Sequence, residues 1–168
     1  SVETNLKSFA AYAPDGVYPE GPGYWEYGTS FEVALIEMLR SAFGGSFGME
    51  KADGFLESSS FIAANPSPSG KVFNFSDGNE KTFFPAPMLW FALERKDASL
   101  LYRFIPQFSD PAHTFLEHGI TVSSSSTARL LPLFVKFAAK TDFANIPAPK
   151  NGLWIGRGEC DVAYIRTG

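Results

Sequence analysis

Two adjoining stretches decide the fold of this chain: PDGVYPEGPGYWEYG at residues 14–28 and TSFEVALIEMLRSAFGG at residues 29–45. The first is rich in glycine, which adopts positive φ without steric cost, and in proline, which presets its own φ, so it predicts a bent loop. The second repeats apolar residues at helical spacing and ends in Gly44-Gly45, which predicts a long helix with a defined stop. We therefore expect a binding loop that runs directly into a helix.

The start and the buried face of this helix are both suggested by its residues. Thr29-x-x-Glu32 matches a capping box, in which each side chain bonds a free backbone N–H, so the helix is expected to begin there. Its apolar stripe is interpreted as core, because none of its members can ligate or polarise a substrate. The stripe consists of Phe31, Leu35, Met38, Leu39 and Phe43.

The loop before the helix combines aromatic rings with carboxylates. Aromatic faces stack on the apolar faces of sugar rings, and tyrosine hydroxyls and carboxylates bond sugar hydroxyls, so this chemistry suits a carbohydrate better than a phosphate. The alternative is a lid whose aromatic rings pack on the protein's own core. The residues concerned are Tyr18, Tyr24, Trp25 and Tyr27, with Asp15, Glu20 and Glu26 as the acids.

The pattern Asp-Gly-x-Tyr-x-Glu-Gly-x-x-Tyr-Trp-x-Tyr-Gly over residues 15–28 resembles the loop-and-helix motif of the heparinase II/III-like polysaccharide lyases and their alginate-lyase relatives. Residues 67–77 are similar to that family's Gly-rich segment ending in Asn-aromatic-x-Asp, and residues 154–166 to its passage into a β-sandwich. The resemblance implies a mainly α fold, with residues 1–150 in an incomplete (α/α) toroid of antiparallel helix pairs. Residues 151–168 are then expected to begin a β element that leads to a missing β-sandwich.

The activity that the resemblance implies is β-elimination on a polysaccharide containing uronic acid. Such an enzyme neutralises the sugar carboxylate, abstracts the C5 proton and protonates the departing glycosidic oxygen. Tyr24 occupies the position of the family's proton-transfer tyrosine, and Tyr18, Glu20, Trp25 and Tyr27 are the expected substrate-binding residues. For Glu20 a structural role, accepting backbone N–H bonds in the turn, stays open.

The resemblance also implies groups that this sequence does not contain: an Asn or His pair from an earlier helix and a histidine from the β-sandwich. We therefore expect part of a longer lyase, bacterial and periplasmic or extracellular, and inactive or nearly so by itself. Its expected partners are an acidic polysaccharide and the missing toroid helices and β-sandwich. Two other interpretations stay open: a non-catalytic carbohydrate-binding module and a purely structural helical domain.

Composition excludes several other classes of protein. The 168 residues carry a net charge of −4 and a pI of about 5.2, with no basic run to neutralise a nucleic-acid backbone, and no apolar run is long enough to span a bilayer. Cys160 is the only cysteine, and His113 and His118 are five residues apart rather than at the i, i+4 spacing of a metal-binding pair. We therefore expect no metal, no cofactor, no nucleic acid and no membrane span.

The remaining elements are expected to be helices until close to the end of the chain. The serines at 58–60 are interpreted as helix-surface residues, since no Gly-x-Ser-x-Gly pattern or histidine partner accompanies them. Helices are expected at about 2–12, after Asp53 up to Asn65-Pro66, at 85–95 and 97–105 with Asp97 as the cap between them, and at 127–140, and β-rich runs at 153–155 and 162–165.

Overall fold

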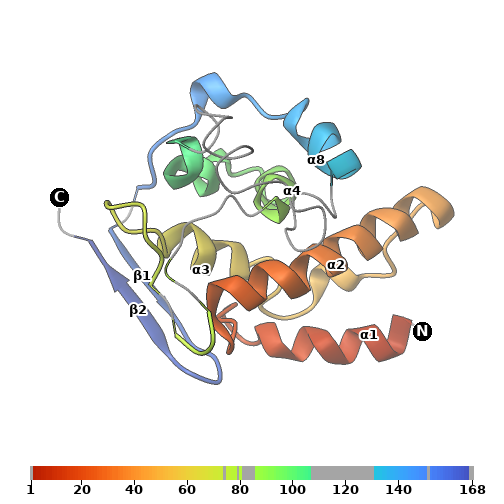
Figure 1. The fold of residues 1–168 in the computed structure, drawn as a ribbon. Coiled ribbons are helices and arrows are strands. Elements are labelled where there is room, and N and C mark those ends of the chain that lie inside the picture. The colour runs from red at the N-terminus through yellow and green to blue at the C-terminus, as the bar shows by residue number, and fades with distance from the viewer. Residues whose placement is uncertain are drawn as a thin grey trace.

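A computed structural model describes residues 2–73, 75–78, 80, 86–106, 131–150 and 152–166. It is mainly helical and carries a short antiparallel hairpin near its C-terminal end, as the sequence predicts (Figure 1). The elements are α1 (Val2–Ser8), η1 (Phe9–Tyr12), α2 (Gly21–Phe43), η2 (Met49–Lys51), α3 (Ser58–Ala64), α4 (Pro87–Glu94), η3 (Ala98–Phe104), α8 (Leu131–Ala138), η4 (Phe143–Asn145), β1 (Leu153–Gly156) and β2 (Val162–Ile165), where η marks a 3-10 helix.

Helix α2 begins at Gly21 rather than at Thr29, so the prediction of a loop over the whole of residues 14–28 is wrong. Pro22 lies in the first helical turn, where its missing N–H costs nothing. The predicted stop is confirmed: Gly44 adopts a φ of 77°, and its N–H bonds the carbonyl of Arg40. As a result, Tyr24, Trp25 and Tyr27 are presented by a rigid helix instead of a loop.

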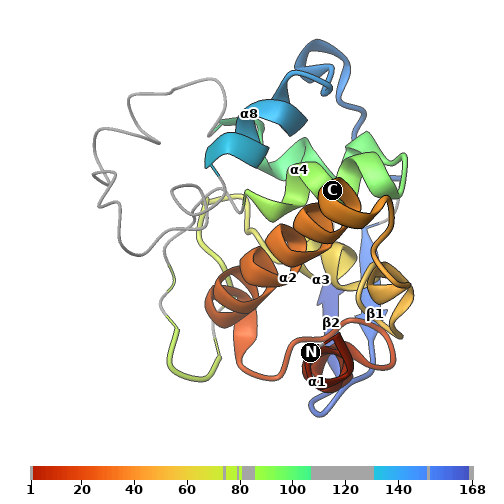
Figure 2. The same ribbon diagram turned by 90° about the vertical axis from the view of Figure 1, so that its right-hand side faces the viewer.

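Thr29 is not a helix cap. It is buried in the middle of α2, where its hydroxyl and that of Tyr12 lie 2.8 Å apart in a hydrogen bond. Glu32, the other half of the predicted capping box, accepts a hydrogen bond from the hydroxyl of Ser8 at 2.7 Å. Both side chains therefore join α2 to the preceding N-terminal segment, which runs in roughly the opposite direction (Figures 1 and 2).

The face of α2 that enters the core is not the one that its apolar stripe predicts. Phe31, Met38 and Phe43 are 51%, 66% and 71% exposed, so for these three residues the expectation of a core stripe is wrong. Trp25, Thr29, Ser30, Val33, Ile36 and Glu37 are buried instead. The buried face contains polar residues that find partners on other elements, and this is why the hydrophobic pattern did not identify it.

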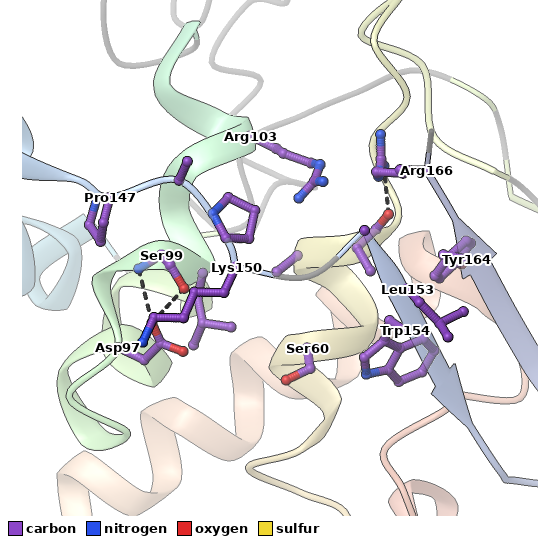
Figure 3. A pocket seen from close by; sticks show the side chains of 16 residues that line it. Ser60, Asp97, Ser99, Arg103, Pro147, Lys150, Leu153, Trp154, Tyr164 and Arg166 are labelled. Atoms are coloured by element: carbon purple, nitrogen blue, oxygen red, sulfur yellow. Dashed lines mark hydrogen bonds between the residues drawn. The ribbon is translucent and has the colours of Figure 1, made fainter. Parts of the chain in front are cut away.

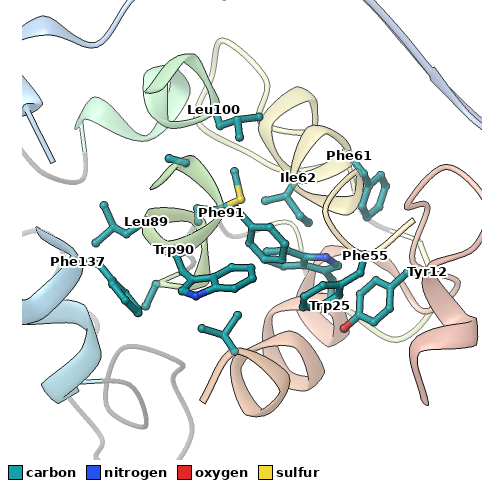
Figure 4. Close-up of a cluster of buried hydrophobic side chains, with 14 of the residues drawn as sticks. Tyr12, Trp25, Phe55, Phe61, Ile62, Leu89, Trp90, Phe91, Leu100 and Phe137 are labelled. Carbon is teal, nitrogen blue, oxygen red and sulfur yellow. The ribbon is translucent and has the colours of Figure 1, made fainter. Parts of the chain in front are cut away.

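The core is built around aromatic side chains from several segments of the chain (Figure 4). The ring of Phe55 lies 4.6 Å from that of Phe9, 5.0 Å from that of Tyr12 and 5.2 Å from that of Phe91. Tilted and edge-on ring contacts at these distances add to the stabilisation from burial. The N-terminal segment, Phe55 and α4 therefore share one core, to which α2 and α3 also contribute buried residues.

Close backbone packing joins the turn before α2 to the start of α3. Gly16 has a φ of +87°, and a Cβ at this position would lie 2.2 Å from the backbone nitrogen of Ser58. Only glycine fits that approach, because L residues avoid this φ and the atom in the way is backbone. The Asp15-Gly16 turn is thus fixed against α3 and determines where α2 begins.

The C-terminal hairpin packs on α3. Strands β1 and β2 are antiparallel, with Trp154 opposite Tyr164, and both rings approach Phe61 of α3 at 5.9 and 6.1 Å. The amide of Asn65, just after α3, donates to the hydroxyl of Tyr164 at 2.6 Å. The hairpin is therefore part of the same packed body as the helices.

A charged network ties α2 to α4 and α8. The carboxylate of Glu37 accepts hydrogen bonds from Lys136 at 2.9 Å, Trp90 at 3.0 Å and Arg40 at 3.1 Å. Burial by itself would raise the pKa of Glu37, but these hydrogen bonds outweigh it and hold the pKa below its ordinary value of 4.5. Arg40 in turn bonds both carboxylate oxygens of Glu94, at 2.7 and 3.0 Å.

Replacing Glu37 by Gln is expected to lower the free energy of unfolding by roughly 2 kcal/mol at pH 7, since charged hydrogen bonds to two cations are lost. Because the pKa of Glu37 is lowered in the folded state, its contribution is complete above pH 4.5 and disappears as the pH falls through the folded-state pKa. Urea unfolding at pH 7 and pH 3 measures both effects.

Glu80→Gln is the control, because its ion pair with Lys71 is exposed, at 64% and 60% of the two side chains. It is expected to change stability by less than about 0.5 kcal/mol. Equal effects of the two substitutions at pH 7 would contradict the importance of the Glu37 network.

Candidate functional site

Tyr24 and Tyr27 lie on one exposed face at the start of α2. They are three residues apart, which places them side by side on a helix, and they are 40% and 54% exposed. No hydrogen bond joins the hydroxyl of Tyr24 to any residue within the described ranges. The ring of Tyr27 packs edge-on against Phe31 at 5.4 Å. The hydroxyl of Tyr24 is therefore available to a ligand.

Tyr18 and Glu20 lie beside this face. The Tyr18 ring packs 5.3 Å from that of Tyr12, and its hydroxyl lies 3.0 Å from the position a Cβ of Gly28 would take, about one helical turn beyond Tyr24. Burial, followed by the charges of Glu20 and Glu32, raises the pKa of Tyr18. Glu20 itself is exposed and immediately precedes α2. The structure thus brings Tyr18, Glu20, Tyr24 and Tyr27 to one end of α2.

Trp25 does not belong to this group. Its side chain is fully buried, its ring lies 5.7 Å from that of Phe91, and its indole N–H donates to the hydroxyl of Ser58 at 2.8 Å. The prediction that Trp25 contacts a substrate is corrected, because the residue leaves no exposed surface for a sugar. Ser58 and Ser59 are also buried, so the interpretation of residues 58–60 as helix-surface serines is wrong for these two.

Asp15, the first residue of the motif, has a structural partner. Its carboxylate accepts hydrogen bonds from the side chain of Arg157 at 2.7 and 3.1 Å and from the backbone N–H of Arg157 at 3.0 Å. These hydrogen bonds lower the pKa of Asp15. The residue therefore fastens the turn before α2 to the loop of the hairpin, a long-range contact that the local motif did not indicate.

His113, His118 and Asn74 are outside the described residues. Cys160 is exposed and carries a free thiol. Over the ranges that the structure describes, no three His, Cys, Asp or Glu side chains gather as metal ligands would, and no helix has the length and apolar character needed to cross a bilayer.

A cavity of about 500 Å³ lies between α3, η3, residues 147–150, Gly152 and the hairpin, and we call it the hairpin cavity (Figure 3). Trp154 and Tyr164 stack on each other at 5.7 Å and form part of its wall. Arg103, Lys150 and Arg166 bring three positive charges to it, and among the described residues of its lining Asp97 is the one acid. Sequence patterns do not indicate this cavity, because its basic residues are far apart in the chain.

Within the described residues, no ion pair joins the carboxylate of Asp97 to the basic residues of the hairpin cavity. The Oδ1 of Asp97 caps η3 by accepting from the N–H and the hydroxyl of Ser99, at 3.0 and 2.6 Å. Burial, followed by the charge of Arg166, lowers the pKa of Arg103, and burial lowers that of Arg166. Such shifts indicate guanidinium groups that have lost hydration without gaining an anionic partner.

Comparison of the chain with protein-family models finds no match, and comparison with curated proteins finds none either. The functional inference therefore depends on the side chains and their geometry.

Trp25 is buried and the adjacent Tyr24 is exposed, so their substitutions should differ in their effect on stability. Trp25→Ala is expected to lower the free energy of unfolding by about 3–5 kcal/mol, since it empties a buried aromatic position and removes the hydrogen bond to Ser58. Tyr24→Ala is the matched control at an exposed position and is expected to cost about 1 kcal/mol or less. Urea unfolding of both variants tests the assignment, which a larger loss for Tyr24→Ala would contradict.

Proposed function

We propose that this chain is part of a polysaccharide lyase that cleaves glycans containing uronic acid by β-elimination, with Tyr24 as the proton-transfer residue. The observation that supports this proposal best is the exposed Tyr24 hydroxyl at the start of α2, with Tyr18, Glu20 and Tyr27 beside it. These are four of the five residues that the motif resemblance selects. Under this proposal residues 1–150 belong to an incomplete (α/α) toroid, and residues 151–168 begin the β part.

The chemistry assigns a specific step to Tyr24. A base removes the C5 proton of the uronate, the C4–C5 double bond forms as the bond from C4 to the glycosidic oxygen breaks, and that oxygen receives a proton. A tyrosine hydroxyl is a hydrogen-bond donor and can give its proton to the leaving oxygen. Tyr24 is proposed as this donor, and other parts of a longer parent protein as the groups that neutralise the carboxylate.

Binding contacts are proposed for the residues around Tyr24. Tyr27, which is exposed, is proposed to contact a sugar through its ring, and the exposed Glu20 to bond sugar hydroxyls. A second candidate function, carbohydrate binding without catalysis, is favoured by the same pair of exposed tyrosines. The two functions share a ligand class and differ in whether the Tyr24 hydroxyl takes part in chemistry.

Tyr24→Phe in the intact parent distinguishes them, because it keeps the ring and removes only the hydroxyl. If Tyr24 transfers a proton, kcat is expected to fall by about a hundredfold or more, with stability little changed. Tyr27→Phe is the control and is expected to change KM more than kcat. Absorbance of the unsaturated product gives both constants, and near-full turnover by Tyr24→Phe would favour the binding function.

The chain by itself is expected to form little or no unsaturated product. Without the groups that neutralise the carboxylate, the transition state loses stabilising contacts that are typically worth about a hundredfold to a thousandfold each. Incubation with uronate polysaccharides, followed by the same absorbance measurement, checks this. Efficient turnover would show that the groups assigned to the rest of the parent are not required.

A further inference from the structure

The hairpin cavity has the features of a ligand site, and none of the residues proposed for the lyase reaction lines it. Its volume of about 500 Å³ is within the range of sites that bind small molecules. We propose that the hairpin cavity binds a small molecule bearing an oxyanion, such as a carboxylate or phosphate group, with Arg103 and Arg166 as its principal contacts. This proposal goes beyond the lyase function and does not depend on it.

Arg103 is the residue in the hairpin cavity best placed to hold an anion. Its guanidinium extends from η3 toward the middle of the cavity (Figure 3). It makes no hydrogen bond or ion pair within the described part of the chain. Its five N–H donors, arranged as a planar fork, are therefore available to accept a carboxylate or phosphate in a bidentate manner.

Arg166 is held in place by the backbone. Its Nη2 donates to the carbonyls of Ala64 and Pro66, and its own backbone N–H bonds the carbonyl of Gly152 at 2.7 Å. These bonds leave Nε and Nη1 without a partner among the described residues. A guanidinium already fixed in this way loses little freedom when a ligand binds, which favours affinity.

Arg103 and Arg166 carry like charges and line the same cavity, an arrangement that is unfavourable without a group of opposite charge. The charge of Arg166 lowers the pKa of Arg103, so the pair repels in the absence of a ligand. A bound oxyanion would attract each guanidinium, which would offset the repulsion between them, and it would replace part of the hydration that both groups have lost. Lys150, exposed at the rim of the cavity, adds a third positive charge that attracts anions from solution.

The remaining walls indicate an organic ligand with a ring or other apolar part. Trp154, Leu153 and Pro147 contribute apolar surface to the lining of the cavity. Sites for small molecules commonly combine such walls with a few polar groups that fix orientation. A ring carboxylate is therefore the expected ligand class, and inorganic phosphate tests whether the charge alone is recognised.

The test measures binding of glucuronate, inorganic phosphate and neutral glucose by calorimetry at low salt. Arg103→Gln removes one cavity charge without breaking a described hydrogen bond, and it is expected to weaken anion binding at least tenfold. Arg103→Lys keeps the charge and is expected to weaken anion binding less than Arg103→Gln does. Lys51→Gln, which makes the same change in net charge at an exposed position outside the cavity, is expected to leave affinity within about twofold.

Each outcome decides the proposal. Binding of glucuronate or phosphate that Arg103→Gln weakens and Lys51→Gln does not would support it, and the stronger of the two ligands would identify the oxyanion. Absence of binding to either anion at about 10 mM, equal binding of glucose, or equal effects of the two Gln variants would overturn it. The lyase proposal is tested by turnover in the intact parent and this one by anion binding that depends on Arg103, so failure of the lyase proposal and failure of this one are distinguishable.

Discussion

The rest of the structure depends on the burial of Trp25. Its ring packs on α4 through Phe91, and its indole N–H bonds Ser58 at the first residue of α3, so one side chain joins three helices. A buried indole needs a hydrogen-bond partner, and Ser58 provides it only in one orientation of α2. The rotation of α2 about its axis follows from this contact. Tyr24 and Tyr27 face outward because Trp25 faces inward.

The turn before α2 shows the same dependence on distant residues. Asp15 bonds Arg157 in the loop of the hairpin, and Gly16 lies against the backbone of Ser58. The motif that the sequence presents as one continuous binding loop is thus divided by the fold into two roles. One group of residues fixes the start of α2 against α3 and the hairpin, and the other, Tyr24 and Tyr27, stays accessible.

Charge is used in two different ways in this protein. At Glu37 a buried carboxylate receives three hydrogen bonds, so each charge there has a partner and the network stabilises the contact of α2 with α4 and α8. In the hairpin cavity Arg103 and Arg166 share one space, and the carboxylate of Asp97 caps η3. Paired charges stabilise contacts between elements of the fold. Unpaired charges that line a cavity are unfavourable unless a ligand of opposite charge binds to them.

The sequence by itself determined the local elements: the mainly helical class, the stop at Gly44, the cap at Asp97 and the C-terminal hairpin. These depend on the φ preferences and hydrogen bonds of near neighbours. Only the tertiary structure decided which face of α2 is buried, that Trp25 belongs to the core, and that Arg103 and Arg166 line one cavity. Burial and pairing are set by partners far away in the chain, and helical spacing contains no information about them.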